Sequence, residues 1–235
     1  MRIPGIEAEI EGAIFDFDGT LMDSMPDWAG KMLHLLQAHG VAYPPDVIRT
    51  ITPLGDTGAA DYFIHQLGLR MTLQEIRREL DAYALPRYRD TIQPKPGVQA
   101  LLQTLQQEGV RLCILTASPQ HMIRPCLART GLAPYFRFAW CCDDLGLKKT
   151  QPQIYEKTCA ALQTAPGRTL FFDDNLLALT TASAAGLAAV GVWDASSAGD
   201  EAAIRAVTCR YLHRWPELLA EQPDEAQRAA ASAVS

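Results

Sequence analysis

The chain has 235 residues, of which 48% are hydrophobic and 20% charged, and its formal net charge is -6 with a pI near 5.4. This length can bury a core and form one domain of ordinary size with a smaller one beside it. The acidic balance offers no basic face for nucleic acid or an anionic membrane, and no run approaches the roughly 18 apolar residues of a membrane span. The six cysteines lack C-x-x-C spacing and most lie in apolar runs, as free thiols do in a reducing compartment. We therefore expect a cytoplasmic protein that binds small ligands, as a monomer or weak homodimer.

The first predicted strand, residues 13–15, ends at two carboxylates and a Gly-Thr turn, Asp16-Phe17-Asp18-Gly19-Thr20. Its apolar run suits a strand buried on both faces of a parallel sheet, and Asp residues belong at the carboxyl end of such a strand. A side-chain period of two places Asp16 and Asp18 on one side, where open α/β sheets bind ligands. Two close carboxylates repel unless a cation or a proton lies between them. A solvated Asp-Gly turn is the simpler alternative.

From residue 24 to residue 92 the pattern is helical, and no strand is expected. Helices are predicted at about 26–40, after Pro44-Pro45-Asp46, at about 56–67, and after Thr72, which can form a capping box with Glu75. Pro86 is expected to interrupt the last of these helices. This segment is therefore predicted to be an all-helical insertion.

From Pro94 the chain alternates between helices and strands. Further strands are expected at about 110–115, 136–141, 169–172 and 188–192, with helices between them; Pro125 predicts a bend or an early end in the helix at about 119–130. This alternation implies an α/β fold with a doubly wound, mostly parallel, Rossmann-like sheet. We expect residues 1–22 and 94–220 to form the α/β core, residues 23–93 a helical domain inserted after the first strand, and residues 221–235 a frayed tail.

Polar groups follow three of the predicted strands: Asp16 and Asp18, then Thr116 and Ser118, then Asp173 and Asp174. The loops after parallel strands converge on one edge of the sheet, so we expect these groups to meet there. Carboxylates from two strand ends suit Mg²⁺, which keeps its other positions for water and a substrate phosphate. Exposed N–H groups at a helix amino terminus, with a hydroxyl beside them, attract a phosphate.

Each of these features also has a simpler explanation when taken alone. Thr116 and Ser118 can be ordinary helix-capping residues, and Asp173-Asp174-Asn175 can be an N-cap with acids near the positive helix end. Lys148 and Lys149 can be a solvated loop pair. The common order of buried strand and then acids, found twice, favours the functional interpretation.

The motifs together resemble those of the haloacid dehalogenase superfamily of hydrolases, most of whose members are Mg-dependent phosphatases. Asp16-Phe17-Asp18-Gly19-Thr20 resembles the first motif, Thr116 stands at the Ser or Thr of the second, residues 149–155 are similar to the third, and Asp173-Asp174-Asn175 to the fourth. The helical insertion is similar to the superfamily's type I cap. Many members carry a further acid at the position of Ala178. The form with two acids and without this further one is similar to the β-phosphoglucomutase and phosphoglycolate phosphatase branch.

The resemblance implies a Mg²⁺-dependent phosphatase that hydrolyses small phosphorylated metabolites, such as sugar phosphates, through an aspartyl-phosphate. It implies the following roles: Asp16 as nucleophile, Asp18 as general acid and base, Thr116, Ala117 and Lys149 on the phosphate, the metal on Asp16, the Asp18 carbonyl and Asp174, and Asp173 in support. The register of Pro152 and Tyr155 favours Lys149 over Lys148 as the functional lysine.

Three other functions use similar residues. A phosphosugar mutase would return the phosphoryl group to a second hydroxyl. A phospho-accepting signalling module of the receiver type gathers comparable groups, but receivers are much shorter and lack a helical insertion, while a catalytically silent binding protein would keep only the fold. The insertion residues considered for contact with a substrate are Lys31, Arg49, Asp56 and Thr57.

Overall fold

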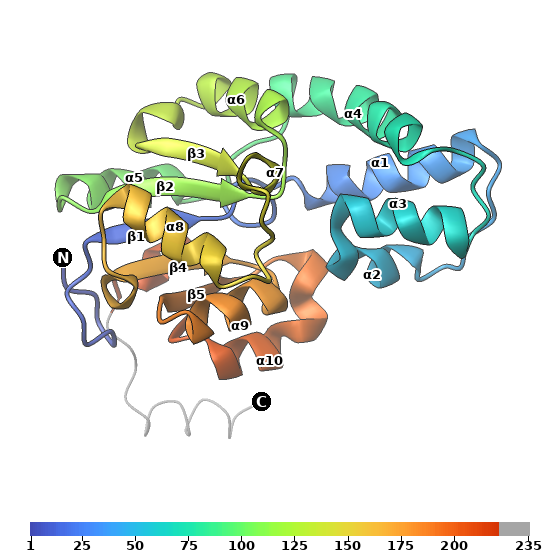
Figure 1. The fold of residues 1–235 in the computed structure, drawn as a ribbon. Helices are drawn as coiled ribbons and strands as arrows, with labels where there is room; N and C mark the ends of the chain where they lie inside the picture. The colour runs from blue at the N-terminus through green and yellow to red at the C-terminus, as the bar shows by residue number, and fades with distance from the viewer. Residues whose placement is uncertain (221–235) are drawn as a thin grey trace, which may run out of the picture.

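A six-stranded, all-parallel sheet forms the centre of the computed structural model, which describes residues 1–220 (Figure 1). Its order is β3-β2-β1-β4-β5-β6. The strands are β1 (Gly12–Phe15), β2 (Arg111–Thr116), β3 (Phe138–Cys141), β4 (Thr169–Asp173), β5 (Ala188–Val192) and β6 (Arg210–Leu212). The chain winds outward in opposite directions from β1 and β4, so the switch point of this doubly wound sheet lies between these two strands.

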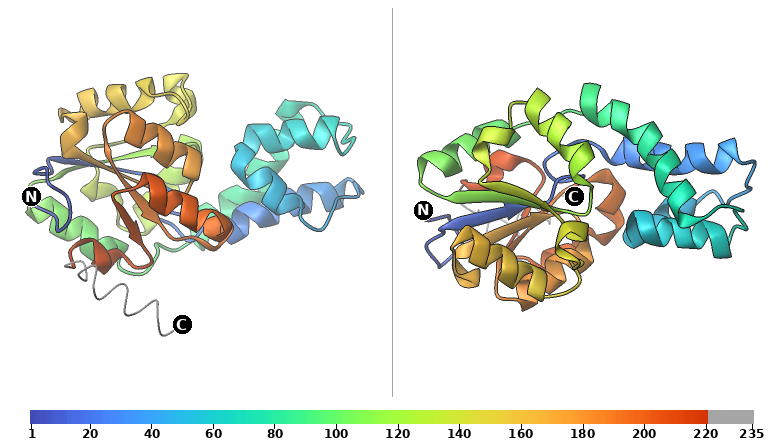
Figure 2. Two further views of the ribbon diagram at one scale, coloured as in Figure 1. Left: turned by 90° about the horizontal axis from the view of Figure 1, so that it is seen from below. Right: turned by 45° about the horizontal axis from the view of Figure 1, so that its top comes forward.

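Helices cover both faces of the sheet (Figure 2). On one face lie α5 (Val98–Gln107) and α6 (Gln120–Arg129); on the other lie α8 (Gln153–Leu162), α9 (Leu176–Ala184) and α10 (Glu201–Val207). Alternate strand residues belong to separate apolar clusters, with Phe15 packed on the first face and Ile14 on the second. This alternation explains why the apolar run before Asp16 has no polar side.

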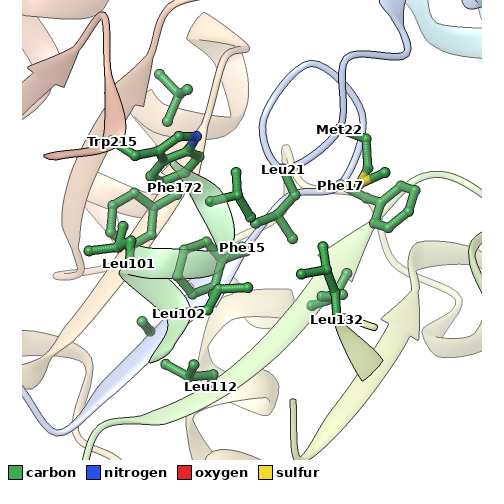
Figure 3. Packing of buried hydrophobic residues seen from close by; sticks show 14 of the residues in the cluster. Phe15, Phe17, Leu21, Met22, Leu101, Leu102, Leu112, Leu132, Phe172 and Trp215 are labelled. Carbon is green, nitrogen blue, oxygen red and sulfur yellow. The ribbon is translucent and has the colours of Figure 1, made fainter. Parts of the chain in front are cut away.

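Aromatic packing holds the middle of the sheet beside the switch point. The Phe15 and Phe172 rings of neighbouring strands stack with their centroids 4.5 Å apart, and Trp215 contacts both (Figure 3). Leu101 and Leu102 of α5 pack in the same cluster. Because all five side chains are buried, the strand ends that carry Asp16 and Asp173 are fixed relative to each other.

Between β1 and β2 the chain forms a separate helical layer, which we call the helical insertion (residues 25–90). It consists of α1 (Met25–Ala38), α2 (Val47–Ile51), α3 (Gly55–His65) and α4 (Leu73–Asp90). Its own apolar cluster includes Met32, Leu36, Phe63, Ile76 and Leu80. The insertion lies beyond the carboxyl ends of the strands, and α1 and α4 connect it to the α/β core (Figure 1).

The capping box predicted at the start of α4 is confirmed, because Thr72 and Glu75 exchange hydrogen bonds of 2.8 and 3.3 Å. The prediction that Pro86 interrupts this helix is wrong: α4 continues to Asp90. The helix loses one backbone bond at Pro86, but Ala84 and Tyr88 on either side of it are buried. Pro125 likewise does not end α6 early.

The sequence did not indicate β6 or α10, which are too short to show a periodic pattern. The remaining short elements are α7 (Cys142–Leu145), η1 (Thr52–Leu54), η2 (Ala133–Tyr135), η3 (Pro166–Arg168), η4 (Ala195–Asp200) and η5 (Trp215–Leu218). The predicted tail, residues 221–235, lies outside the described residues. Within the described part, every cysteine is a free thiol, and no helix has the length and apolar character needed to cross a membrane.

Candidate active site

Three aspartates from adjacent strands meet at the switch point of the sheet. Phe15 pairs with Phe172 across β1 and β4, so Asp16 and Asp173, the next residues, emerge side by side. One carboxylate oxygen from each of Asp16, Asp173 and Asp174 lies within 4.8 Å of the others, and all three residues are buried. The structure thus brings together the acids that the sequence placed after two separate strands.

The turn after Asp18 contacts the Asp174 carboxylate and fixes its position. The hydroxyl of Thr20 donates a 3.0 Å hydrogen bond to one Asp174 oxygen. Gly19 has a φ of +73°, and a Cβ at this position would come within 2.7 Å of the other Asp174 oxygen. Only glycine allows both this backbone conformation and this close approach of the carboxylate.

Lys149 lies between two of the acids. Its Nζ donates to Asp16 and, at 2.8 Å, to Asp173. The Tyr155 hydroxyl lies 2.8 and 2.9 Å from the carbonyl oxygens of Lys149 and Ala178 and shares its one proton between them, which fixes the loop before α8 against α9. Lys148 is exposed. The structure therefore brings Lys149, and not Lys148, to Asp16.

Burial and mutual repulsion dominate the electrostatics of this cluster. Burial and, to a smaller extent, the charges of Asp173 and Asp18 raise the pKa of Asp16 to about 7, although the charge of Lys149 opposes them. Burial, Asp173 and Asp16 raise the pKa of Asp174 well above its usual range. Burial alone would lower the pKa of Lys149, but Asp16 and Asp173 hold it well above normal.

The donor set of the cluster fits a hard divalent cation. Three buried carboxylates face one ammonium group, so the cluster carries an excess of negative charge when ionised. A cation among the carboxylates would relieve the repulsion that raises their pKa values, and Mg²⁺ prefers oxygen ligands of this kind. The residues Asp16 and Asp174 predicted for the metal belong to this cluster, and Asp173 joins them.

The Asp18 side chain has a different environment. Its carboxylate accepts hydrogen bonds from the hydroxyls of Ser24 at 2.6 Å, Tyr88 at 2.5 Å and Ser118 at 2.5 Å. These donors come from the start of α1, the end of α4 and the loop after β2. The carboxylate is thus held where the helical insertion meets the core. The sequence predicts that Asp18 contacts the metal through its backbone carbonyl and not through this carboxylate. That contact stays a prediction.

Sequence reasoning missed Ser24 and Tyr88 as partners of Asp18. The sequence shows only that Ser24 precedes the first helix of the insertion and that Tyr88 lies late in its last helix. Neither position indicates a contact with Asp18. The Tyr88 hydroxyl is buried, and burial together with the Asp18 charge raises its pKa well above normal. Tyr88 is therefore a neutral donor to Asp18.

The predicted phosphate-binding residues follow β2, next to β1. Thr116 is buried, and its hydroxyl oxygen accepts a 3.0 Å hydrogen bond from the Ser118 N–H. The hydroxyl hydrogen of Thr116 can still be donated to an anion. Ala117 is exposed at the strand end. Their position beside Asp16 suits an anion close to that carboxylate.

Of the insertion residues considered for substrate contact, two form a pair. The Lys31 Nζ lies 2.6 Å from the Asp56 carboxylate, and the Lys31 side chain is buried. Arg49 and Thr57 are exposed. The structure thus joins a cation of α1 to an acid of α3 within the insertion.

A doubly wound sheet with a carboxylate cluster and a paired lysine at its switch point has the groups needed for phosphoryl transfer. The model of the haloacid dehalogenase-like hydrolases matches residues 10–186, and the chain belongs to this family. The matched residues include β1, the helical insertion and β4.

Curated relatives of the chain are phosphatases. The chain is 24% identical over 178 residues to the phosphorylated carbohydrates phosphatase of Thermotoga maritima, covering 76% of this chain and 82% of that one. It is 27% identical over 186 residues to the phosphoglycolate phosphatase of Pseudomonas putida, covering 76% and 68%. The family and these relatives identify the activity as that of a phosphatase.

Solved structures share the fold. CbbY from Rhodobacter sphaeroides in complex with phosphate aligns with a TM-score of 0.79 at 21% identity, over 89% of this chain and 96% of that one. β-Phosphoglucomutase from Clostridium difficile aligns with a TM-score of 0.71 at 16% identity, over 96% and 99%. The chain therefore shares its fold with CbbY and with a β-phosphoglucomutase.

Proposed function

We propose that the protein hydrolyses small phosphorylated metabolites with Mg²⁺ through an aspartyl-phosphate at Asp16. The observation that carries this proposal is the meeting of Asp16, Asp174 and Lys149 at the switch point, with Asp18 nearby. Residues 1–22 and 94–220 then form the catalytic core, and residues 23–93, which include the helical insertion, form the cap. The phosphatase names of the relatives support the same reaction.

The first step uses two carboxylates in different roles. A carboxylate oxygen of Asp16 attacks phosphorus, the bond from phosphorus to the leaving oxygen breaks, and Asp18 gives that oxygen a proton. In the second step Asp18 takes a proton from water, which attacks the aspartyl-phosphate and releases inorganic phosphate. Asp18 is available for both transfers because its carboxylate is not part of the cluster of Asp16, Asp173 and Asp174 and is held in place by three hydroxyl groups.

The other residues compensate negative charge. Lys149 holds the Asp16 carboxylate and would contact a phosphoryl oxygen, and the Thr116 hydroxyl and Ala117 N–H would donate to the others. Asp173 orients Lys149. When bound by Asp16 and Asp174, with the Asp18 carbonyl, Mg²⁺ would offset the charge of the phosphoryl group and the nucleophile.

The test is hydrolysis of p-nitrophenyl phosphate with Mg²⁺. We expect steady turnover that EDTA removes and that Asp16→Asn reduces below about 1% of wild type, because the amide is not a nucleophile. Asp23→Asn, a change of the exposed acid in the same loop, is the control and should retain turnover. A single burst without turnover would identify a receiver-like phospho-acceptor, and no reaction at all would indicate a silent binding protein.

The phosphosugar mutase is distinguished by the fate of β-glucose 1-phosphate. A phosphatase releases inorganic phosphate from it. Conversion to glucose 6-phosphate, stimulated by glucose 1,6-bisphosphate, would instead establish the mutase.

A further inference from the structure

Helices α1 and α4 of the insertion each have a face that begins at a residue bonded to Asp18. On α1, Ser24 donates to Asp18, and Trp28 and Lys31 follow it by four and seven residues. Residues at this spacing share one helix face. Trp28 and Lys31 therefore extend the same face that begins at the Asp18 carboxylate.

The face of α4 that carries Tyr88 also looks toward the α/β core. Asp81 lies seven residues before Tyr88 and pairs with His121 of α6 at 3.2 Å. Arg77, one turn earlier, lies 3.4 Å from Asp143 of α7. Both partners belong to the core, so this face and that of α1 bound the approach to Asp18.

Trp28, Lys31 and Asp56 form a hydrogen-bonded group on this approach. The Trp28 indole N–H donates to one Asp56 oxygen at 2.7 Å, and the Lys31 ammonium donates to the other at 2.6 Å. The Lys31 side chain is 4% exposed, whereas that of Asp56 is 45% exposed. The carboxylate is therefore open to a ligand, while the cation behind it is covered and already paired.

This group is close to the reacting side of the site. Trp28 lies about one helical turn and Lys31 about two turns beyond Ser24, whose hydroxyl contacts Asp18. Asp56 and Lys31 also act on Asp81, whose pKa is raised chiefly by burial. A leaving group bonded to a phosphoryl group at Asp16 would extend past Asp18 toward these residues.

The chemistry of the group favours a neutral ligand that carries hydroxyls. Each Asp56 oxygen has one donor and keeps further acceptor capacity for a hydroxyl. The Trp28 ring is half-buried against the insertion's own apolar cluster, and the part that stays exposed would pack on the carbon skeleton of a sugar. A carboxylate or a second phosphate would instead meet the acids Asp56 and Asp81, with Lys31 already neutralised.

We propose that Trp28, Lys31 and Asp56 select a neutral, polyhydroxylated leaving group, so that the substrates are monophosphates of sugars or polyols and not phosphoglycolate or bisphosphates. This inference rests on the proposed phosphatase function. In this proposal the Asp56 carboxylate accepts a hydrogen bond from a substrate hydroxyl. The same carboxylate also pairs with Lys31, so that the lysine charge does not attract an anionic leaving group.

The experiment compares kcat/KM for p-nitrophenyl phosphate, phosphoglycolate and a set of monophosphates whose leaving group is a neutral sugar or polyol: glucose 6-phosphate, mannose 6-phosphate, ribose 5-phosphate and sorbitol 6-phosphate. We expect the best sugar phosphate to exceed phosphoglycolate by at least about 10-fold, the effect of one well-placed polar contact. Values for each variant are divided by its own value for p-nitrophenyl phosphate, whose leaving group lacks these hydroxyls.

Asp56→Asn should change this preference in a particular direction. Loss of the carboxylate weakens the sugar contact and exposes the charge of Lys31, so the ratio of sugar phosphate to phosphoglycolate should fall by about 30-fold or more. Adding Lys31→Met to Asp56→Asn should remove the gain for phosphoglycolate. Asp61→Asn, on the same helix but exposed and paired with His65, is the matched control and should keep the wild-type ratio.

The two proposals fail in distinguishable ways. Wild type that turns over p-nitrophenyl phosphate but prefers phosphoglycolate would overturn the selection of a neutral leaving group and leave the phosphatase intact. An unchanged ratio in Asp56→Asn, with a thermal melt that shows folded protein, would do the same. Absence of all turnover with Mg²⁺ would overturn the proposed phosphatase function itself.

Discussion

The hydroxyl of Tyr88, near the end of α4, donates a 2.5 Å hydrogen bond to the carboxylate of Asp18, in the loop after β1. The two residues are 70 positions apart in the chain, with nearly the whole helical insertion between them. Ser24 binds the same carboxylate from the other end of the insertion. Asp18 thus joins both connections between the insertion and the core, in addition to its proposed role in proton transfer.

Tyr88→Phe tests the structural part of this relationship. The change removes one donor from a carboxylate that keeps two others, so we expect the free energy of unfolding to fall by about 1 to 2 kcal/mol. Urea denaturation measures this loss. Tyr62→Phe, in α3 of the same insertion, should cost less than about 0.5 kcal/mol. Equal losses in the two variants would show that the bond to Asp18 adds nothing particular.

Asp18→Asn tests the role of Asp18 as the general acid. An amide has no acidic proton to give, so we expect loss of activity to be greater for a sugar phosphate than for p-nitrophenyl phosphate. A nitrophenolate leaves readily without protonation, whereas an alkoxide does not. The measurement is kcat/KM for both substrates in both proteins. Equal losses would argue that Asp18 does not protonate the leaving group.

Lys149 and Lys148 are adjacent and chemically identical, which makes them a matched pair. Lys149→Ala leaves the buried carboxylates of Asp16 and Asp173 facing each other without their common partner, and kcat/KM should fall by at least about 100-fold. Lys148→Ala removes an exposed side chain and should leave activity within about threefold of wild type. The reverse ranking would place the functional lysine at Lys148.

Gly19→Ala tests the close approach of Asp174. Alanine at a φ of +73° costs about 1 to 2 kcal/mol, and its Cβ would also displace the Asp174 carboxylate. Gly40 has a similar φ of +63°, but a Cβ added there would meet no atom within 4 Å, so Gly40→Ala isolates the backbone cost. We expect both variants to lose stability, but only Gly19→Ala to lose activity with Mg²⁺. Retained activity in Gly19→Ala would show that Asp174 can move without consequence.

The strands and their acids were predictable because the signal is local. An apolar run that stops at Asp16 or Asp173 marks a buried strand end, and parallel strands bring such ends to one edge. The hydroxyls that hold Asp18 were not predictable in this way. Ser24 and Tyr88 meet Asp18 only after α1 and α4 pack against each other, and helical periodicity within one element carries no information about that contact.

The pH dependence of stability should reveal the mutual repulsion of the buried carboxylates in the cluster. Burial raises the pKa of Asp16 from 3.8 to about 7 and that of Asp174 well above its usual range. Between about pH 4 and pH 7 the folded protein therefore holds protons that the unfolded chain has released. Stability from these groups is fully present below the unfolded pKa and is lost as the pH rises through the folded pKa.

In EDTA the melting temperature is accordingly expected to fall between about pH 5 and pH 7.5, and Mg²⁺ should raise it more at the higher pH, where the carboxylates are ionised and free to bind. At a Mg²⁺ concentration of about 100 times its Kd the stabilisation is about 2.7 kcal/mol. Asp16→Asn carries no titrating group at that position, so both the pH slope and the Mg²⁺ shift should be smaller than in wild type. A wild-type melting temperature that rises over this range in EDTA, or a Mg²⁺ shift that is equal at the two pH values, would contradict a metal site built on these carboxylates.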